Sequence, residues 1–483
     1  MKAVTTFLSD DEVVKIHEAT LDVLEKTGVA IGSEEVASYL EGKGAKACGD
    51  IVRFPREMVR EAISQINHEV LFAARDPKKD FVIPYRNTTF NSTSGYSPFI
   101  YDEPGGPRRQ STARDLEMAA RLCDALDEVD FFWPIVMPTE EACGELEEIS
   151  ALDVSIRNIT KHIECSCASK SAAQWQVRIA EAVCGGADAL KKRPLFSAVA
   201  SPTTPLAIEG FIADAFSVFA KAGVPVTPMN VPLGGTTAPC SFAGALVVTN
   251  AEQLATLLIL KAYNPDAPMV YSADTGSADL RTGNVAYNNP DYDLYSFACA
   301  QLARFYDIPC TVGSGSYEEK DFSTVAGFNQ NVLKAAINQM SMTDGACWIG
   351  SLDDCLATSW WDIVLDCEVC KYAKLYCKEL AVDDESLALD VIHEVGPRGE
   401  FITHEHTLNN FRNEITLTSV SDSFLFQTPE KNYVELAREK ANGILEGLGP
   451  AGSAGPAAPV ALDDALVIEL DDIMNAARKD LGA

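Results

Sequence analysis

Histidine, the side chain most often used for acid–base catalysis near neutral pH, is scarce here: the 483 residues include six histidines. The one local cluster is His404-Glu405-His406, whose spacing suits either a metal site on a strand or a structural pair, and no third ligand lies nearby. Cys165-Ser166-Cys167 and Cys367-Glu368-Val369-Cys370 are equally incomplete, since zinc needs three or four ligands. We therefore expect the protein itself to bind no metal.

Aromatic side chains are the more distinctive chemical feature. The chain has five tryptophans, and three of them lie close together near residue 350. Aromatic faces attract quaternary ammonium ions through cation–π interactions, without any proton transfer. Each ring, taken alone, is better explained as part of the hydrophobic core. Taken together, they predict a cation-binding pocket that includes Tyr96, Phe99, Tyr317, Trp348, Trp360 and Trp361.

Two further features allow a functional and a purely structural interpretation. The loop Gly234-Gly235-Thr236-Thr237 precedes a predicted helix that begins near Ser241. Backbone N–H groups at such a position bind anions, so the loop is either a carboxylate site or only a tight turn. Lys170 is either a Schiff-base lysine of an aldolase-like lyase or a solvated lysine at the start of a helix.

The elements that must position these residues follow a regular rhythm. Short apolar, β-branched or aromatic runs recur about every 30 to 44 residues, and each is followed by a turn and a longer amphipathic stretch. Successive βα units of this kind predict a (β/α)₈ TIM barrel, whose active site lies at the carboxyl ends of its strands. A doubly wound sheet is the alternative, but Gly313-Ser314-Gly315 lacks the third glycine of a dinucleotide-binding turn. The eight runs begin near residues 89, 131, 162, 195, 226, 269, 310 and 346.

The ends of the chain differ from this rhythm. Ser9-Asp10-Asp11-Glu12 is a capping box, and amphipathic stretches cover residues 34–40 and 55–66. We therefore predict an N-terminal helical extension over residues 1–70 and the barrel domain over 71–448. A Gly/Pro/Ala-rich linker and a short helix at 463–481 make up the remainder, 449–483.

Composition excludes several classes of protein. Lys and Arg total 39 against 70 Asp and Glu, which gives a net charge of −31 and argues against nucleic acid and anionic membranes as partners. The start of the chain lacks the apolar segment of a secretory signal, and 14 scattered cysteines are typical of reduced thiols, so we expect a cytoplasmic protein. The acidic surface keeps the chain soluble or steers a complementary partner.

Several segments resemble the trimethylamine methyltransferase (MttB-like) family, in the same order along the chain. They are residues 8–29, Phe72-Ala73-Ala74-Arg75-Asp76-Pro77, Thr236-Thr237-Ala238-Pro239, residues 301–310, and the stretch from His406-Thr407-Leu408 to Phe411-Arg412. The resemblance implies a TIM barrel that moves a methyl group from a methylamine to the cobalt of a separate corrinoid protein. It also implies that cobalamin chemistry is supplied by that partner. Barrels with added helical ends often self-associate, so we expect a homo-oligomer.

The archaeal members of the family carry pyrrolysine, which is absent here. The corresponding loop resembles the segment around Ser316, Tyr317 and Glu318, so these residues join His404 and His406 as pocket candidates. Members without pyrrolysine act on quaternary amines such as glycine betaine, proline betaine, carnitine or γ-butyrobetaine. Trp360-Trp361 departs from the family's usual phenylalanine and suggests a tailored aromatic wall. A Schiff-base lyase centred on Lys170 and a non-catalytic amine-binding protein are the alternatives.

Overall fold

The computed structural model describes residues 5–84, 88–141, 144–287, 289–313, 325–375, 381–415, 424–426, 430–448 and 462–482. Its centre is a sheet of eight parallel strands, in which sequence neighbours are also spatial neighbours. A parallel bridge between Tyr271 and Cys310 joins the two ends of the sheet and closes it into a barrel. The strands are β6 (Phe90–Thr93), β9 (Phe131–Phe132), β10 (His162–Ser166), β11 (Phe196–Ala200), β13 (Val226–Asn230), β15 (Ser272–Ala273), β17 (Thr311–Gly313) and β18 (Gly345–Ile349).

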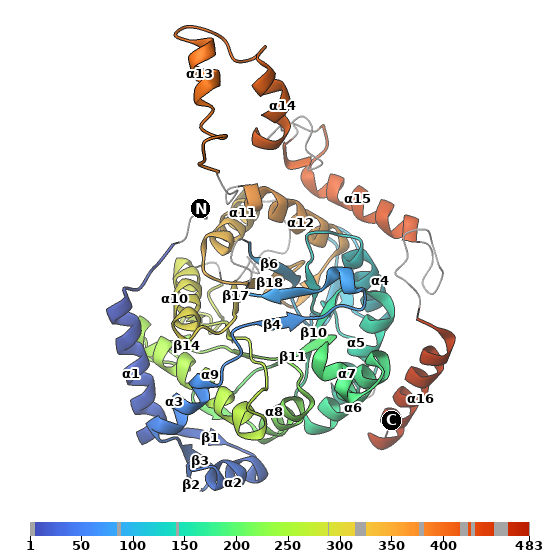
Figure 1. Cartoon of the computed structure of the whole chain (residues 1–483). Helices are drawn as coiled ribbons and strands as arrows, with labels where there is room; N and C mark the ends of the chain where they lie inside the picture. The colour runs from blue at the N-terminus through green and yellow to red at the C-terminus, as the bar shows by residue number, and fades with distance from the viewer. Residues whose placement is uncertain are drawn as a thin grey trace.

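Each barrel strand is followed by a helix, and the helices surround the strands as an outer ring (Figure 1). All eight predicted runs form barrel strands, so the predicted TIM barrel is confirmed. The helices of the ring are α4 (Ala113–Asp124), α5 (Gly144–Asn158), α6 (Lys170–Cys184), α8 (Gly210–Ala222), α9 (Phe242–Tyr263), α10 (Pro290–Tyr306), α11 (Val325–Met340) and α12 (Trp360–Leu375), with the short α7 (Ala187–Lys192) after α6.

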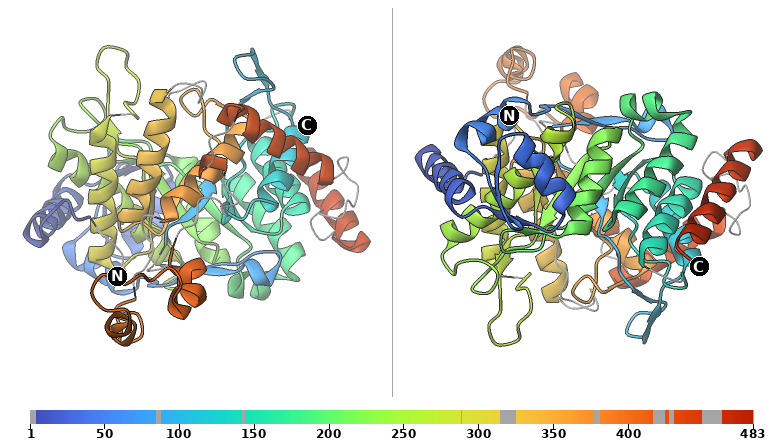
Figure 2. Two further views of the ribbon diagram at one scale, coloured as in Figure 1. Left: turned by 90° about the horizontal axis from the view of Figure 1, so that it is seen from above. Right: turned by 90° about the horizontal axis from the view of Figure 1, so that it is seen from below.

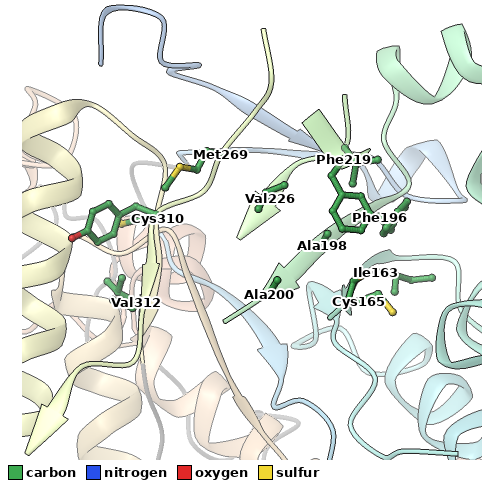
Figure 3. Packing of buried hydrophobic residues seen from close by; sticks show 14 of the residues in the cluster. Ile163, Cys165, Phe196, Ala198, Ala200, Phe219, Val226, Met269, Cys310 and Val312 are labelled. Atoms are coloured by element: carbon green, nitrogen blue, oxygen red, sulfur yellow. The ribbon is translucent and has the colours of Figure 1, made fainter. Parts of the chain in front are cut away.

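Alternation along the strands separates two layers of side chains. Residues of one parity pack outward against the helices: Phe196 of β11, for example, meets Phe219 of α8 edge-on, with the ring centroids 6.1 Å apart. Residues of the other parity point into the barrel, as Glu164 and Ser197 do. Figure 3 shows part of the outward layer, including Ile163, Cys165, Phe196, Ala198 and Phe219.

A hairpin covers the amino ends of the strands. It consists of β4 (Val70–Phe72) and β5 (Phe81–Ile83), and Phe72 packs edge-on against Phe131 and stacks on His162, with centroid distances of 5.4 and 4.3 Å. Val70, Ile83 and Val270 complete this cluster. The hairpin therefore closes one end of the barrel and leaves the carboxyl ends of the strands as the end with a cavity.

Removing the aromatic ring of Phe72, which packs against the amino ends of the strands, should destabilise the barrel strongly. Phe72 is fully buried, so we expect Phe72→Ala to lower the free energy of unfolding by about 3–5 kcal/mol, through lost burial and the cavity left behind. Val82→Ala in the same hairpin is the control, because Val82 is 41% exposed and should cost little. Thermal unfolding followed by circular dichroism compares the two variants; equal midpoints would contradict the plugging role.

The N-terminal segment combines helices and a small sheet. The predicted helices are present as α1 (Asp10–Lys26), α2 (Glu34–Gly42) and α3 (Arg56–Ser64), and Ser9 and Glu12 form the predicted capping box. The segment also contains three strands that the sequence analysis did not predict, because each has only three residues. They are β1 (Val29–Ile31), β2 (Lys46–Cys48) and β3 (Ile51–Arg53), and β1 pairs with β12 (Ala207–Ile208) in the loop after β11.

After α12 the chain leaves the barrel and returns to it. Helices α13 (Leu389–Val395) and α14 (Glu405–Glu414) project from the ring, whereas α15 (Tyr433–Leu448) packs on α12 and α16 (Asp464–Asp480) packs on α6 (Figure 1). The helix predicted at 463–481 is thus confirmed as α16, and the predicted linker 449–459 lies outside the described residues. In Figure 2, α13 and α14 lie toward the side opposite the loops that protrude after β7 (Phe99–Tyr101) and β16 (Gly276–Ser277).

One helix of the described chain, α9, is long and apolar enough to span a membrane by length and composition. Most of it is buried inside the protein, where it packs against α1, α3 and α8. Burial on several faces explains its apolar character, because a helix covered on all sides needs no polar face.

Candidate active site

A cavity of about 190 Å³ opens at the carboxyl ends of the barrel strands, where TIM-barrel enzymes place their active sites. Its walls come from most of the strands and from the loops that follow them, so residues far apart in the sequence meet there. The lining residues are Ser94, Gly95, Trp133, Glu164, Val199, Thr227, Met229, Val231, Ser272, Ala273, Asp274, Tyr287, Thr311, Val312, Gly313, Cys347 and Cys355.

Glu164, in the middle of β10, places a carboxyl group inside the barrel. Thr227 Oγ1 donates a hydrogen bond to Oε1 at 2.8 Å, and the Cys347 thiol donates to Oε2 at 3.5 Å. Burial raises the pKa of Glu164 to about 7, and these hydrogen bonds offset only part of that effect. The thiol stays protonated, since burial and the neighbouring carboxylate raise the pKa of Cys347 well above its usual value.

Asp274 supplies a second carboxyl group from the loop after β15. The Tyr292 hydroxyl of α10 donates a hydrogen bond to Asp274 Oδ1. Burial raises the pKa of Asp274 to about 7, and the charge of Lys334 opposes this rise. The Lys334 ammonium group itself is held by the Tyr287 carbonyl at 2.8 Å and by Asp293 Oδ1 at 3.0 Å. Near pH 7 each cavity carboxyl is therefore poised between its neutral and charged forms.

Two aromatic side chains line the same cavity. Trp133 follows β9, and its indole Nε1 donates a hydrogen bond to Ser166 Oγ at 3.1 Å. Gly95 packs so closely on the indole ring that a Cβ atom there would lie 2.0 Å from Trp133 Cε2. Tyr287 comes from the loop before α10, and its ring packs edge-on against Tyr292 with centroids 5.3 Å apart. A cavity with two carboxyls and two aromatic rings suits a small organic cation.

The predicted aromatic residues lie elsewhere in the described part of the barrel. Trp348 follows the cavity residue Cys347 in β18, so strand alternation turns its ring to the outer layer, where Nε1 lies 3.4 Å from Asn91 Oδ1. The Tyr96 hydroxyl lies 3.9 Å from Cys165 Sγ, and the Arg108 guanidinium stacks 4.2 Å above the Phe99 ring. Trp360 and Trp361 begin α12 and pack into the hydrophobic core. The candidates Ser316, Tyr317 and Glu318 lie outside the described residues.

The loop Gly234 to Thr237 forms a tight turn beside the mouth and does not line the cavity. Two of its backbone donors are used within the turn: the N–H groups of Gly235 and Thr236 donate to the carbonyls of Ala238 and Leu233, at 3.1 and 3.0 Å. Thr237 Oγ1 accepts a hydrogen bond from the Leu233 N–H at 2.9 Å. Turn geometry explains the glycine at position 235, because its φ of +96° is a backbone conformation that favours glycine.

The remaining candidates are also distant from the cavity. His404 caps the projecting helix α14, where its Nδ1 accepts a hydrogen bond from the His406 N–H at 3.0 Å. The Lys170 ammonium pairs with Glu35 at 2.6 Å, and this hydrogen bond raises the pKa of Lys170, whereas a Schiff-base lysine needs a lowered pKa. Cys367 and Cys370 are buried in α12. Over the part of the chain that the structure describes, no three His, Cys, Asp or Glu side chains are grouped to hold a metal ion.

Glu164, Trp133 and Tyr287 are site residues that the sequence did not predict. Glu164 lies in the run His162-Ile163-Glu164-Cys165, where a charged residue between apolar neighbours is the available signal. Strand alternation places such a residue on the face opposite its neighbours, and in a barrel that face is the interior.

The closed barrel and the cavity at the carboxyl ends of its strands define an enzyme of the TIM-barrel class. The profile of the trimethylamine methyltransferase (MTTB) family matches residues 2–480. The chain is 31% identical to glycine betaine methyltransferase of Desulfitobacterium hafniense (strain Y51), over 89% of each chain. It is 29% identical to trimethylamine methyltransferase MttB of Desulfitobacterium hafniense (strain DSM 10664 / DCB-2), over 92% of this chain and 90% of that one. The chain therefore belongs to the trimethylamine methyltransferase family and is a methyltransferase.

The monomethylamine methyltransferase of Methanosarcina barkeri shares the fold. Its crystal structure superposes with a TM-score of 0.53 at 12% identity, over 92% of this chain and 89% of that chain. At this identity the match supports the TIM-barrel architecture alone.

Proposed function

We propose that this methyltransferase removes a methyl group from a small quaternary amine and passes it to the corrinoid of a separate protein. The observation that supports the proposal is the cavity itself, in which Glu164, Asp274, Trp133 and Tyr287 surround a space of about 190 Å³. Carboxylates and aromatic faces both attract a permanent organic cation. A relative that is 31% identical is named for glycine betaine, a quaternary amine.

The residues of the cavity suit a transfer that needs no acid–base catalyst. A quaternary nitrogen leaves as a neutral tertiary amine: the C–N bond breaks, its electron pair stays on nitrogen, and no proton moves. A bound corrinoid supplies the strong cobalt nucleophile that accepts the methyl group. The chain's own residues then have to hold the cation, keep water away and aim one methyl group at the open end of the barrel. The described lining contains no histidine, and its two carboxyls and two aromatic rings can hold the cation, which fits that task.

The partner protein and the setting belong to the same proposal. We infer a cognate corrinoid protein that docks over the carboxyl ends of the barrel strands, a cytoplasmic location and a homo-oligomeric enzyme. Docking at that end follows from the position of the cavity, because the methyl group has to meet its acceptor there.

A methyl-transfer assay tests the proposal directly. The purified full chain is mixed with reduced cobalamin and with tetramethylammonium, choline, glycine betaine, carnitine or trimethylamine in turn, and the loss of the reduced-cobalt absorbance is followed. At least one quaternary amine should support enzyme-dependent transfer and yield its tertiary amine, detected by mass spectrometry. Failure of every quaternary amine, with free cobalamin and with a corrinoid protein alike, would overturn the proposal.

A further inference from the structure

The charged side chains among the described lining residues of the cavity are all acidic. Glu164 from β10 and Asp274 from the loop after β15 both line it, and none of its described lining residues is Lys, Arg or His. The nearby Lys334 is already held by Asp293 and the Tyr287 carbonyl. Arg108, near the barrel mouth, pairs with Asp353 at 2.5 Å. A negative group that entered the cavity would thus meet two carboxyls and no cationic partner from its described walls.

Building on the proposed function, we infer that the cavity takes an alkylammonium cation whose remaining substituent is uncharged, because Glu164 and Asp274 line it and none of its described lining residues is a cation. Betaine-type compounds, in which a carboxylate lies close to the nitrogen, are then expected to be poor ligands of this cavity. The cavity is below the roughly 300–1,000 Å³ of sites for drug-sized ligands, so both ends of a small amine would share it. A substrate carboxylate would then be repelled by both acidic groups.

The loop from Gly234 to Thr237, which the sequence suggested as a carboxylate site, already uses backbone N–H groups in its own hydrogen bonds. The N–H groups of Gly235, Thr236 and Ala238 all donate to carbonyls within the turn. None of the three residues lines the cavity. The described cavity walls thus provide no side-chain cation for a substrate carboxylate, and these three N–H groups of the turn are already engaged.

A hydroxyl on the substrate, in contrast, has a partner. Thr311 lines the cavity from β17 and is 6% exposed, yet its Oγ1 has no hydrogen-bond partner in the described part of the protein. Buried hydroxyls are nearly always hydrogen-bonded, so an unpaired one beside an empty space indicates a bond made by a ligand. The neighbouring hydroxyls are already engaged: Thr227 donates to Glu164, and Ser272 donates to the Thr311 carbonyl at 2.8 Å. Thr311 therefore favours a hydroxyl-bearing ammonium of the choline type.

Calorimetric titration of the full chain at pH 8 tests the inference without requiring methyl transfer. The key comparison is between glycine betaine and betaine amide, which differ only in the carboxylate that the amide replaces with an uncharged carboxamide. We expect betaine amide, choline and tetramethylammonium to bind at least about tenfold more tightly than glycine betaine. Thr311→Val should weaken choline binding by about three- to tenfold and leave tetramethylammonium binding unchanged.

The outcomes separate this inference from the proposed function. Equal or tighter binding of glycine betaine than of betaine amide would overturn the inference and leave the proposed function standing. An absence of binding by every quaternary ammonium would overturn both. Loss of tetramethylammonium binding in Thr311→Val would overturn the role of Thr311, provided that its thermal unfolding midpoint matches that of the unaltered protein.

Discussion

Gly95→Ala is expected to lower the efficiency of methyl transfer by at least about 100-fold. An added Cβ would lie 2.0 to 2.5 Å from three atoms of the Trp133 indole, which is far below van der Waals contact. The ring is buried and its Nε1 is hydrogen-bonded to Ser166, so relief requires the indole to move within the cavity or the loop after β6 to shift. Either movement changes the wall that holds the cation. The measurement is kcat/KM with a quaternary amine and reduced cobalamin.

Gly443→Ala is the matched control for this substitution. Gly443 lies in α15, where an added Cβ would meet nothing within 4 Å, and alanine is favoured over glycine inside a helix by roughly 1 kcal/mol. This variant should keep full activity and unfold at an equal or higher temperature. An active Gly95→Ala enzyme would show that Trp133 is not a fixed wall of the substrate site.

The fold was predictable from the sequence because each barrel strand carries its own local signal. The runs near residues 162, 195 and 226 are rich in apolar and β-branched residues, and their spacing leaves room for one helix between strands. The three-residue strands β1, β2 and β3 were not predicted, because such short segments are specified by their pairing partners rather than by their own composition.

The site was harder to predict, because it depends on which face of each strand turns inward. Cys347 and Trp348 are adjacent in β18, yet one lines the cavity and the other packs outside the barrel. A shift of one residue in register would exchange them, and composition carries no information about that register. Glu164 and Trp133 were not predictable as site residues for the same reason, since only closure of the barrel shows that they face a common space.

The second large effect concerns pH. Tetramethylammonium has no titratable proton, so any pH dependence of its binding belongs to the protein. The pKa values of Glu164 and Asp274 are both raised to about 7 by burial, and the cation favours the ionised form of each group. Affinity should therefore rise between pH 6 and pH 8, by about tenfold for each carboxyl that must be ionised. Glu164→Gln and Asp274→Asn should each flatten this profile, and calorimetry at several pH values measures it.

The other groups that face these carboxyls should not produce the same profile. Thr227, Ser197 and the protonated Cys347 thiol surround Glu164, while Tyr292, Tyr287 and Lys334 lie near Asp274. The Tyr287 hydroxyl and the Cys347 thiol keep their protons, because burial raises the pKa of each group. Lys334 pairs with Asp293 at 3.0 Å. The profile should thus report the two carboxyls.

Stability should depend on pH in the opposite sense. The folded-state pKa of Glu164 lies above its ordinary value of 4.5, so folding favours the protonated form. The stability associated with that proton is fully present below pH 4.5 and is lost as the pH rises through about 7. Glu164→Gln, which cannot ionise, should therefore be more stable than the unaltered protein at pH 8, by about 3 kcal/mol, while the difference disappears near pH 4. Glu148→Gln is the control that distinguishes the effect of a buried carboxyl on stability from its effect on cation binding. Burial also raises the pKa of Glu148 to about 7, although Glu148 does not line the cavity. It should show the stability gain at pH 8 and an unchanged affinity for tetramethylammonium; equal loss of affinity in both variants would mean that the pH profile reports stability rather than the charge of the cavity.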